Sequence, residues 1–382
     1  METIKTKILE EFTDVANTLV NPEMKKWREQ GGKMIGYYCC YAPEEIITAA
    51  GFLPYRIRAT GSKGTELSDA HMSSINCSFC RHSMNLALGG EYDFLDGVVW
   101  LNTCDHLRRT YDIWTRKVET PFTHMLSFPR TQGEAQVQWF REELDQYRQS
   151  LGKQFGIQVS DERLRDAIKL HNETRRLQRK LYELRKREKP LLTGSEMLAV
   201  TVAGTAMPKA RYNAMLKELV EEISKREGIG GYRARLMLVG SIVDDPAYVK
   251  IIEDLGGLVV TDSLCYGSRN LWSDVSEEGD PLTALARYHV MERPSCPRIF
   301  GCFPKMVEFL NAMIRDFKVD GVISERMQFC DLWGMANYQL TKEFAETKVP
   351  LLVMEREYLL GGIGQLRTRV QAFLETIEKG GD

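Results

Sequence analysis

The chain has 382 residues, of which 27% are charged, and its formal net charge is -2. A charge this close to zero gives no general reason to expect nucleic acid or an anionic membrane as a partner. No stretch approaches the roughly 20 apolar residues of a membrane span, and the N-terminal sequence METIKTKILEEF has acidic residues where a signal peptide would have its apolar core, so we expect a cytoplasmic protein.

The length favours two domains, because chains beyond roughly 250 residues seldom build a single core. The sequence contains nine cysteines. Reducing compartments keep thiols free, so a cytoplasmic chain would not use them as a disulfide framework. Metal binding and burial as small apolar side chains are the roles that remain.

Residues 1–135 are predicted to form a first α/β domain. The apolar run from Met34 to Tyr38 predicts a strand, Pro43 opens a helix, and Gly51 ends that helix before the next strand. The runs VVWL and TPFTHML predict two further strands of the same domain.

Cysteines follow two strands of this domain. Cys39 comes directly after the first strand, and Cys104 comes shortly after the run VVWL. With Asn102 or Thr103 as the cap, Cys104 would lie in the first turn of a helix, where unpaired N–H groups and the helix dipole favour a thiolate over a thiol. Thiolates are the ligands that soft metals prefer.

Residues 136–230 are predicted to be a mostly helical connecting segment, and residues 231–382 a second α/β domain. In this second domain LMLVG and LVVTD predict strands, and Asp245–Pro246 predicts the start of the helix between them. Such a βαβ unit implies a parallel sheet. Cys265 follows the LVVTD strand, and Cys330 follows the strand in VDGVIS.

Four cysteines therefore follow predicted strands: Cys39, Cys104, Cys265 and Cys330. Open parallel sheets bind ligands outside the carboxyl ends of their strands, so we expect these sulfurs to converge in a cleft between the two domains. A single cysteine is more often a small buried hydrophobe, but the repeated position of the set favours a metal.

Spacing indicates which metal centre to expect. There is one C-x-x-C sequence, Cys77 to Cys80, with no second pair, which disfavours a zinc site. Iron–sulfur clusters take thiolates from distant segments and suit the layout better. His106 comes two residues after Cys104, a position from which it can supply a proton near a cluster. No G-x-x-x-x-G-K-[ST] sequence is present, so the chain has no visible ATP phosphate loop of its own.

Seven separated motifs extend over nearly the whole chain: GYYCCYAPEEIITAAGFLPYRI, INCSFCRH, NTCDHLRRTYDIW, VTDSLCYGSR, RPSCPR, VDGVI with QFCD, and GQLRTRVQAFLE. In this order they resemble the benzoyl-CoA reductase and 2-hydroxyacyl-CoA dehydratase family. The resemblance implies two flavodoxin-like domains with an iron–sulfur cluster in the cleft between them. It also implies a separate ATP-hydrolysing iron–sulfur activator that delivers a low-potential electron.

Carried onto this sequence, the resemblance assigns a [4Fe–4S] cluster to Cys77, Cys104 and Cys330. An electron added to the thioester carbonyl of an acyl-CoA substrate gives a ketyl radical anion, from which a 2-hydroxyl leaves or an aromatic ring is reduced. Three further cysteines bring the number to six, which the double-cubane branch of the family uses for an 8Fe–9S cluster: Cys39, Cys265 and Cys296. The remaining cysteines are expected to be non-ligands: Cys40, Cys80 and Cys302.

We therefore expect an iron–sulfur catalytic subunit of an ATP-dependent benzoyl-CoA-type reductase, with a homologous subunit or a second copy of itself as partner. One alternative is a homodimeric double-cubane reductase of small molecules, and another is a 2-hydroxyacyl-CoA dehydratase subunit. A non-catalytic alternative is a subunit that carries a cluster only to transfer electrons. The alternative without metal is a two-domain α/β binding protein.

Overall fold

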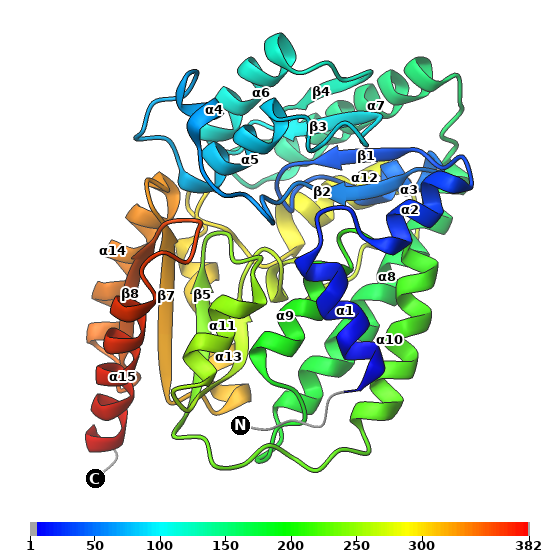
Figure 1. Ribbon diagram of the computed structural model, residues 1–382. Helices are drawn as coiled ribbons and strands as arrows, with labels where there is room; N and C mark the ends of the chain where they lie inside the picture. Colours follow the sequence, from blue (N-terminus) through cyan, green and yellow to red (C-terminus); the bar gives the residue numbers. More distant parts are fainter. Residues whose placement is uncertain (1–5, 381–382) are drawn as a thin grey trace.

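The computed structural model describes residues 6–380 and contains two four-stranded parallel sheets (Figure 1). The first sheet forms the N-terminal lobe and the second the C-terminal lobe. The strands are β1 Met34–Tyr37, β2 Leu53–Arg56, β3 Gly97–Leu101, β4 Thr123–Leu126, β5 Ala234–Gly240, β6 Gly257–Ser263, β7 Gly321–Met327 and β8 Leu351–Arg356.

Helices connect and cover these strands. They are α1 Lys7–Asn17, α2 Pro22–Glu29, α3 Glu44–Ala49, α4 Glu66–Asp69, α5 Ser78–Leu88, α6 Asp105–Lys117, α7 Glu134–Phe155, α8 Asp161–Arg185, α9 Gly194–Ala203, α10 Lys209–Ile223, α11 Pro246–Glu253, α12 Pro281–Arg287, α13 Phe303–Phe317, α14 Asp331–Ala345 and α15 Ile363–Gly380, with a 3-10 turn η1 Ser268–Asn270 and a π-helical turn η2 Tyr288–Glu292.

The two sheets have the same strand order. In the N-terminal lobe it is β2-β1-β3-β4, and in the C-terminal lobe it is β6-β5-β7-β8. Tyr37 at the end of β1 lies opposite both Arg56 of β2 and Val99 of β3, so the carboxyl ends of these strands meet at one edge. This doubly wound order confirms the predicted fold class of two flavodoxin-like parallel sheets.

Both sheets are covered on both faces, as the near-continuous apolar runs of the strands require. In the N-terminal lobe, α3 and α7 share a core with one face, and α5 and α6 share a core with the other. In the C-terminal lobe, α11 and α15 cover one face while α13 and α14 cover the other. The predicted helix cap at Asp245 is confirmed, since its side chain accepts the Ala247 N–H at 2.9 Å.

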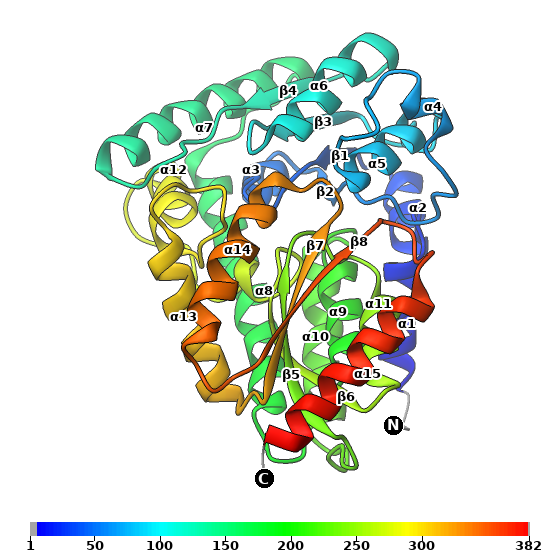
Figure 2. The ribbon, with the colours of Figure 1, turned by 90° about the vertical axis from the view of Figure 1, so that its left-hand side faces the viewer.

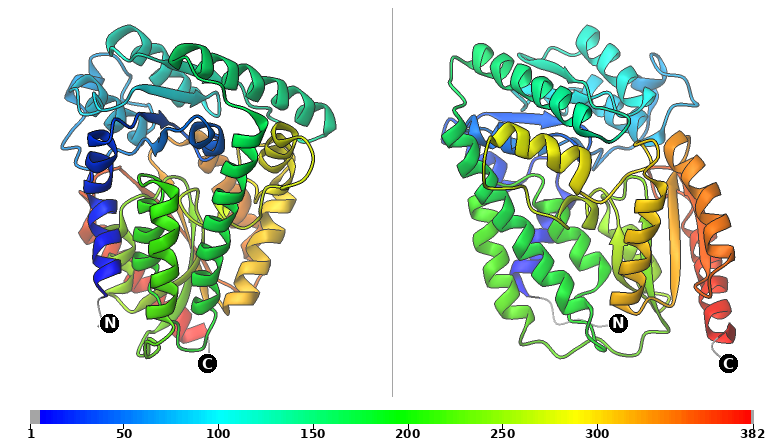
Figure 3. Two further views of the ribbon diagram at one scale, coloured as in Figure 1. Left: turned by 90° about the vertical axis from the view of Figure 1, so that its right-hand side faces the viewer. Right: turned by 180° about the vertical axis from the view of Figure 1, so that it is seen from behind.

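The predicted connecting segment corresponds to α7–α10, and its helices are divided between the lobes. Helix α7 packs on β4 and α12, whereas α9 packs on β6 and α11 (Figure 3). The N-terminal helix α1 is not an isolated surface helix, because its apolar face packs against α9 and α10. The domain boundaries at residues 135 and 230 remain predictions.

The carboxyl ends of the C-terminal strands point toward the N-terminal lobe (Figure 2). The long connection between β6 and α13 crosses to that lobe, where the Gln132 side chain donates to the Val290 carbonyl at 2.7 Å. The Ala59 N–H donates to the Tyr358 hydroxyl at 3.0 Å, which ties the lobes on another side. No helix of residues 6–380 has the length and apolar character needed to cross a bilayer.

Candidate functional site

The three cysteines that the resemblance assigns to the cluster each stand directly before a helix. Cys77 is the N-cap of α5, Cys104 of α6 and Cys330 of α14, and none of the three side chains caps its own helix. The expectation that Asn102 or Thr103 would be the cap, with Cys104 inside the first turn, is wrong by one position. The reason is that Thr103 N–H bonds back to Leu101 as the strand ends, so the helix starts one residue later. Each sulfur therefore sits at the positive end of a helix dipole.

These cysteines and Cys80 come together at the interface of the lobes, and we call them the first thiol group. Cys77 and Cys80 are buried in one apolar cluster, and the half-buried Cys104 and Cys330 pack against it. Burial raises the pKa of the Cys104 thiol to about 12, whereas the N–H groups of Leu107 and His106 act in the opposite direction. Burial also raises the pKa of Cys330, and the neighbouring sulfurs of Cys77 and Cys104 raise it further.

His106 joins the three helix starts of the first thiol group. The Cys77 N–H donates to His106 Nδ1 at 3.4 Å, and His106 Nε2 lies 3.2 Å from Asp331 Oδ2, next to Cys330. His106 Nδ1 is also 3.1 Å from Asn76 Oδ1. The ring thus contacts groups beside Cys77 and Cys330 while it stands two residues after Cys104.

A second thiol group lies next to the first and consists of Cys39, Cys40, Cys265 and Cys296. A hydrogen bond with Cys265 lowers the pKa of Cys40 well below its ordinary range, and Arg293 and Arg56 also lower it. Cys39, Cys265 and Cys296 belong to or pack against one apolar cluster, and the Cys296 sulfur is also close enough to Cys330 to raise the pKa of that thiol.

Two cysteine turns contain strained backbone. Cys39 has φ 74° and Phe329, immediately before Cys330, has φ 62°. Positive φ is uncommon for residues other than glycine and costs of order 1–3 kcal/mol. The surrounding fold holds both turns in this conformation, and in each case the strained residue is a candidate ligand or its neighbour.

Within residues 6–380, no three His, Cys, Asp or Glu side chains are arranged to hold one metal ion. A [4Fe–4S] cluster instead binds each cysteine through a different iron, so its ligands stand farther apart than those that share an ion. The three helix N-termini favour thiolates, which is the form of cysteine that binds iron.

The sequence predicts that Cys40, Cys80 and Cys302 are not cluster ligands. In the structure, only Cys302 lies away from the two thiol groups. Cys302 is the N-cap of α13, and its neighbours Ser295 and Lys305 belong to neither thiol group. Cys80 hydrogen-bonds with Cys77, and Cys40 with Cys265 and Cys39, so their sulfurs lie beside candidate ligands.

Sequence reasoning also missed the buried arginines around the second thiol group. Arg108 and Arg109, which follow Cys104 closely in the sequence, pair instead with Asp105 at 3.3 Å and Asp112 at 3.1 Å on the exposed face of α6. The buried arginines are Arg56, Arg269, Arg293 and Arg298. Two of them have a sequence signal, since the motif RPSCPR places Arg293 and Arg298 within three residues of Cys296.

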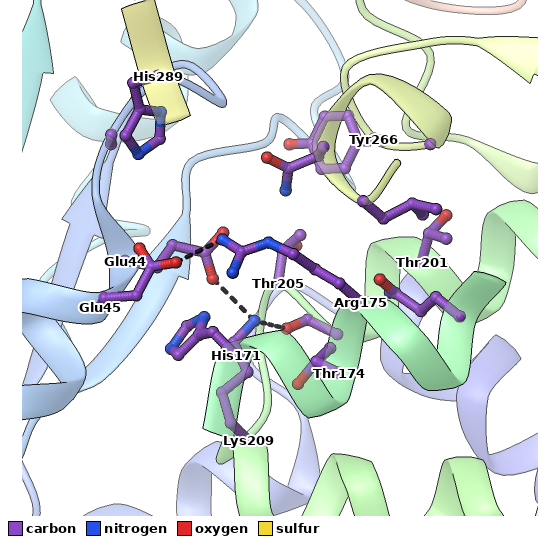
Figure 4. A pocket seen from close by; sticks show the side chains of 16 residues that line it. Glu44, Glu45, His171, Thr174, Arg175, Thr201, Thr205, Lys209, Tyr266 and His289 are labelled. Atoms are coloured by element: carbon purple, nitrogen blue, oxygen red, sulfur yellow. Dashed lines mark hydrogen bonds and ion pairs between the residues drawn. The ribbon is translucent and has the colours of Figure 1, made fainter. Parts of the chain in front are cut away.

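A polar pocket beside the second thiol group was missed as well (Figure 4). It lies between α3, α8 and α10 and has about 40 Å³ of space, enough for two or three water molecules. Glu44 accepts the Tyr37 hydroxyl at 2.6 Å and pairs with Lys209 at 2.7 Å. Glu45 pairs with Arg175, which outweighs burial and holds the pKa of that carboxyl far below its usual range.

Sequence comparisons show the family of the chain. Residues 39–377 match the family model described as 2-hydroxyglutaryl-CoA dehydratase, D-component. The chain belongs to this family of subunits of dehydratase and benzoyl-CoA reductase enzymes.

Relatives of known function match almost end to end. The chain is 27% identical to the (R)-phenyllactyl-CoA dehydratase beta subunit of Clostridium sporogenes, over 96% of this chain and 98% of that protein. It is 28% identical to one of the benzoyl-CoA reductase subunits of Thauera aromatica, over 93% of this chain and 94% of that protein. It is 25% identical to the (R)-2-hydroxyglutaryl-CoA dehydratase beta subunit of Acidaminococcus fermentans, over 97% of this chain and 99% of that protein.

Proposed function

We propose that this chain is the iron–sulfur catalytic subunit of an ATP-dependent, low-potential acyl-CoA reductase of the benzoyl-CoA reductase type. One observation carries the proposal: Cys77 and Cys104 from the N-terminal lobe and Cys330 from the C-terminal lobe occupy the N-cap positions of three helices that start around one histidine. A cluster on these three sulfurs would supply electrons at low potential, and its iron without a protein ligand would be free to take a substrate or water oxygen.

His106 is suited to hold and release a proton in this setting. When the ring is neutral, Nδ1 accepts the Cys77 N–H and the proton on Nε2 faces Asp331. When the ring is charged, Nδ1 donates to Asn76 Oδ1 and Nε2 lies 3.2 Å from Asp331 Oδ2 in an ion pair. Because both protonation states have partners, the ring can pass a proton to a reduced acyl group without moving.

The relatives support the reaction class and the partners. The Thauera aromatica relative is named as part of benzoyl-CoA reductase, and the other two as beta subunits of acyl-CoA dehydratases. For this chain we propose an acyl-CoA substrate and, as partner, a homologous subunit or a second copy. The sequence has no ATP phosphate loop, which agrees with electron supply by a separate ATP-hydrolysing activator.

The test is an anaerobic purification from the native host together with the subunits that co-purify. The purified complex, its activator, ATP and a low-potential donor are then offered benzoyl-CoA and a 2-hydroxyacyl-CoA in separate assays. ATP-dependent reduction of benzoyl-CoA, lost in a complex that carries Cys104→Ser, supports the proposal. Dehydration of the hydroxyacyl-CoA without ring reduction would replace it by the dehydratase alternative, and electron uptake with no acyl-CoA turnover would replace it by an electron-transfer role.

A second candidate function is a homodimeric double-cubane reductase of small molecules, which the second thiol group favours. Cys39, Cys265 and Cys296 add three sulfurs beside the first group, as a second cubane would need. Iron and sulfide analysis separates the candidates, because one [4Fe–4S] cluster gives about four irons per chain and two linked cubanes about eight.

A further inference from the structure

Four buried arginines enclose the second thiol group, and we call them the arginine cage: Arg56, Arg269, Arg293 and Arg298. They come from β2, η1 and the β6–α13 connection, and their exposed fractions are between 1% and 4%. None of the four forms an ion pair with a carboxylate of residues 6–380. Burial of an unpaired charge is expensive, so this amount of positive charge requires a negative partner.

Two members of the cage bind the thiol group directly. Arg56 donates from Nη2 to Cys265 Sγ at 2.9 Å and from Nη1 to the Cys265 carbonyl at 2.6 Å. Arg293 donates from Nη2 to Cys40 Sγ at 3.1 Å and to the Arg269 carbonyl at 2.9 Å. The guanidinium groups are therefore fixed against the sulfurs.

Other nitrogen atoms of the cage have no hydrogen-bond acceptor within residues 6–380. They are Arg269 Nε and Nη1, Arg293 Nε, and Arg298 Nε and Nη2. Aromatic rings hold these groups in place, with Arg293 over Tyr41 at 4.2 Å and Arg298 over Phe128 at 4.4 Å. A ring face attracts a cation but does not replace an anion, so buried donors and charge are both left for another group to satisfy.

The first thiol group lies in a different electrostatic environment. Asp331 directly follows Cys330, and its carboxylate lies 3.2 Å from the ring of His106, so a negative side chain stands beside this group. Positive charge is thus concentrated at the second group.

We propose that the arginine cage neutralises an anionic iron–sulfur cluster held by the second thiol group and gives it a higher reduction potential than the cluster on Cys77, Cys104 and Cys330. This inference rests on the second candidate function, because it requires a cubane on the second thiol group, and it adds a role that the cysteines alone do not supply. Nearby positive charge stabilises the more negative, reduced form of a cluster. The two thiol groups are then unequal electron acceptors within one chain.

The test is a redox titration, followed by electron paramagnetic resonance, of the full chain purified anaerobically. Wild type is expected to contain about eight irons and to show two midpoint potentials, and Cys265→Ser should remove the higher one together with about four irons. Arg269→Met should lower the higher potential by about 59 mV, a tenfold fall in the ratio of reduced to oxidised cluster for a one-electron couple. Arg269→Lys keeps the charge and should stay close to wild type.

Controls keep the result unambiguous. Arg315→Met removes an exposed arginine of α13 and should leave both potentials unchanged. If Arg269→Met does not fold, Arg293→Met gives the same test. Two results would contradict the proposed role of the arginine cage and leave the proposed function intact. One is unchanged reduction potentials in the methionine variants, and the other is about four irons per chain in both wild type and Cys265→Ser. Iron-free wild-type protein would overturn the proposed function itself.

Discussion

His106 Nε2 lies 3.2 Å from Asp331 Oδ2, and the two residues belong to helices of different lobes. Each stands in the first turn of its helix, within two residues of a candidate cluster ligand. The contact therefore joins the lobes at the point where Cys104 and Cys330 approach each other.

Replacing His106 by glutamine should slow substrate reduction by roughly 10²–10⁴-fold, the usual contribution of a positioned acid–base group. Iron content should stay at the wild-type value, because the imidazole contacts the backbone of Cys77 rather than supplying a ligand sulfur. Asp331→Asn, which keeps a hydrogen-bond acceptor, should have a smaller effect. A wild-type rate in His106→Gln would exclude the ring as the proton donor.

The Cys104→Ser variant tests whether Cys104 acts as a cluster ligand or only as the N-cap residue of α6. Serine is a favoured N-cap residue, so α6 should remain as stable as in wild type or become more stable. Cluster binding should nevertheless be lost, measured as iron and sulfide per chain. The matched control is Cys302→Ser, which changes the N-cap of α13 outside both thiol groups and should keep all of the iron. Equal loss of iron in both variants would show that the cysteines act through folding alone.

Stability should fall below neutral pH because of buried neutral histidines. Burial lowers the pKa of His171 to about 4, while its value in the unfolded chain is about 6.5. Between these values the unfolded chain binds more protons, so stability decreases as pH falls from 6.5 toward 4. The loss from His171 alone should be about 2 kcal/mol between pH 7 and pH 5.

This effect is measured as urea denaturation of the cluster-free chain at pH 7 and pH 5. His171→Gln should lose less stability than wild type over the same interval, because glutamine does not titrate. His171 Nε2 and Thr48 Oγ1 lie 2.9 Å apart, so some loss at both pH values is expected in the variant. The same pH dependence in the two proteins would contradict the pKa assignment.

Arg58 should be a main stabiliser of the N-terminal helix. It donates to the carbonyls of Ala16 at 2.7 Å, Val15 at 2.8 Å and Thr18 at 2.7 Å, where α1 ends. Arg58→Met removes three buried hydrogen bonds at the end of α1 and should cost roughly 3 kcal/mol. Arg108→Met removes an exposed arginine paired only within α6 and should cost less than about 0.5 kcal/mol. Similar melting temperatures for the two variants would show that α1 does not depend on this contact.

The sequence predicts the strands of both sheets because buried parallel strands are continuous apolar runs with local stop signals. Pro43 before α3 and Asp245 before α11 are such local signals, and each stands where its helix begins. The place of α1 cannot be predicted in this way, since its partners α9 and α10 lie far along the chain.

The site is predictable to a similar extent. Strand order brings the carboxyl ends together, so the convergence of cysteines from distant segments follows from their positions after strands. The contacts of the arginine cage do not follow, because Arg56 and Cys265 are 209 residues apart and Arg293 and Cys40 are 253 apart. Only the packing of the two lobes determines which arginine meets which sulfur.

The most direct test of the shared centre is iron and acid-labile sulfide per chain in three anaerobically purified proteins: wild type, Cys104→Ser and Cys330→Ser. One cysteine belongs to each lobe, so a centre that both lobes hold should be lost from either variant while wild type retains about four or more irons. Full iron content in either variant, or a colourless wild type after anaerobic reconstitution, would contradict a cluster held jointly by the two lobes.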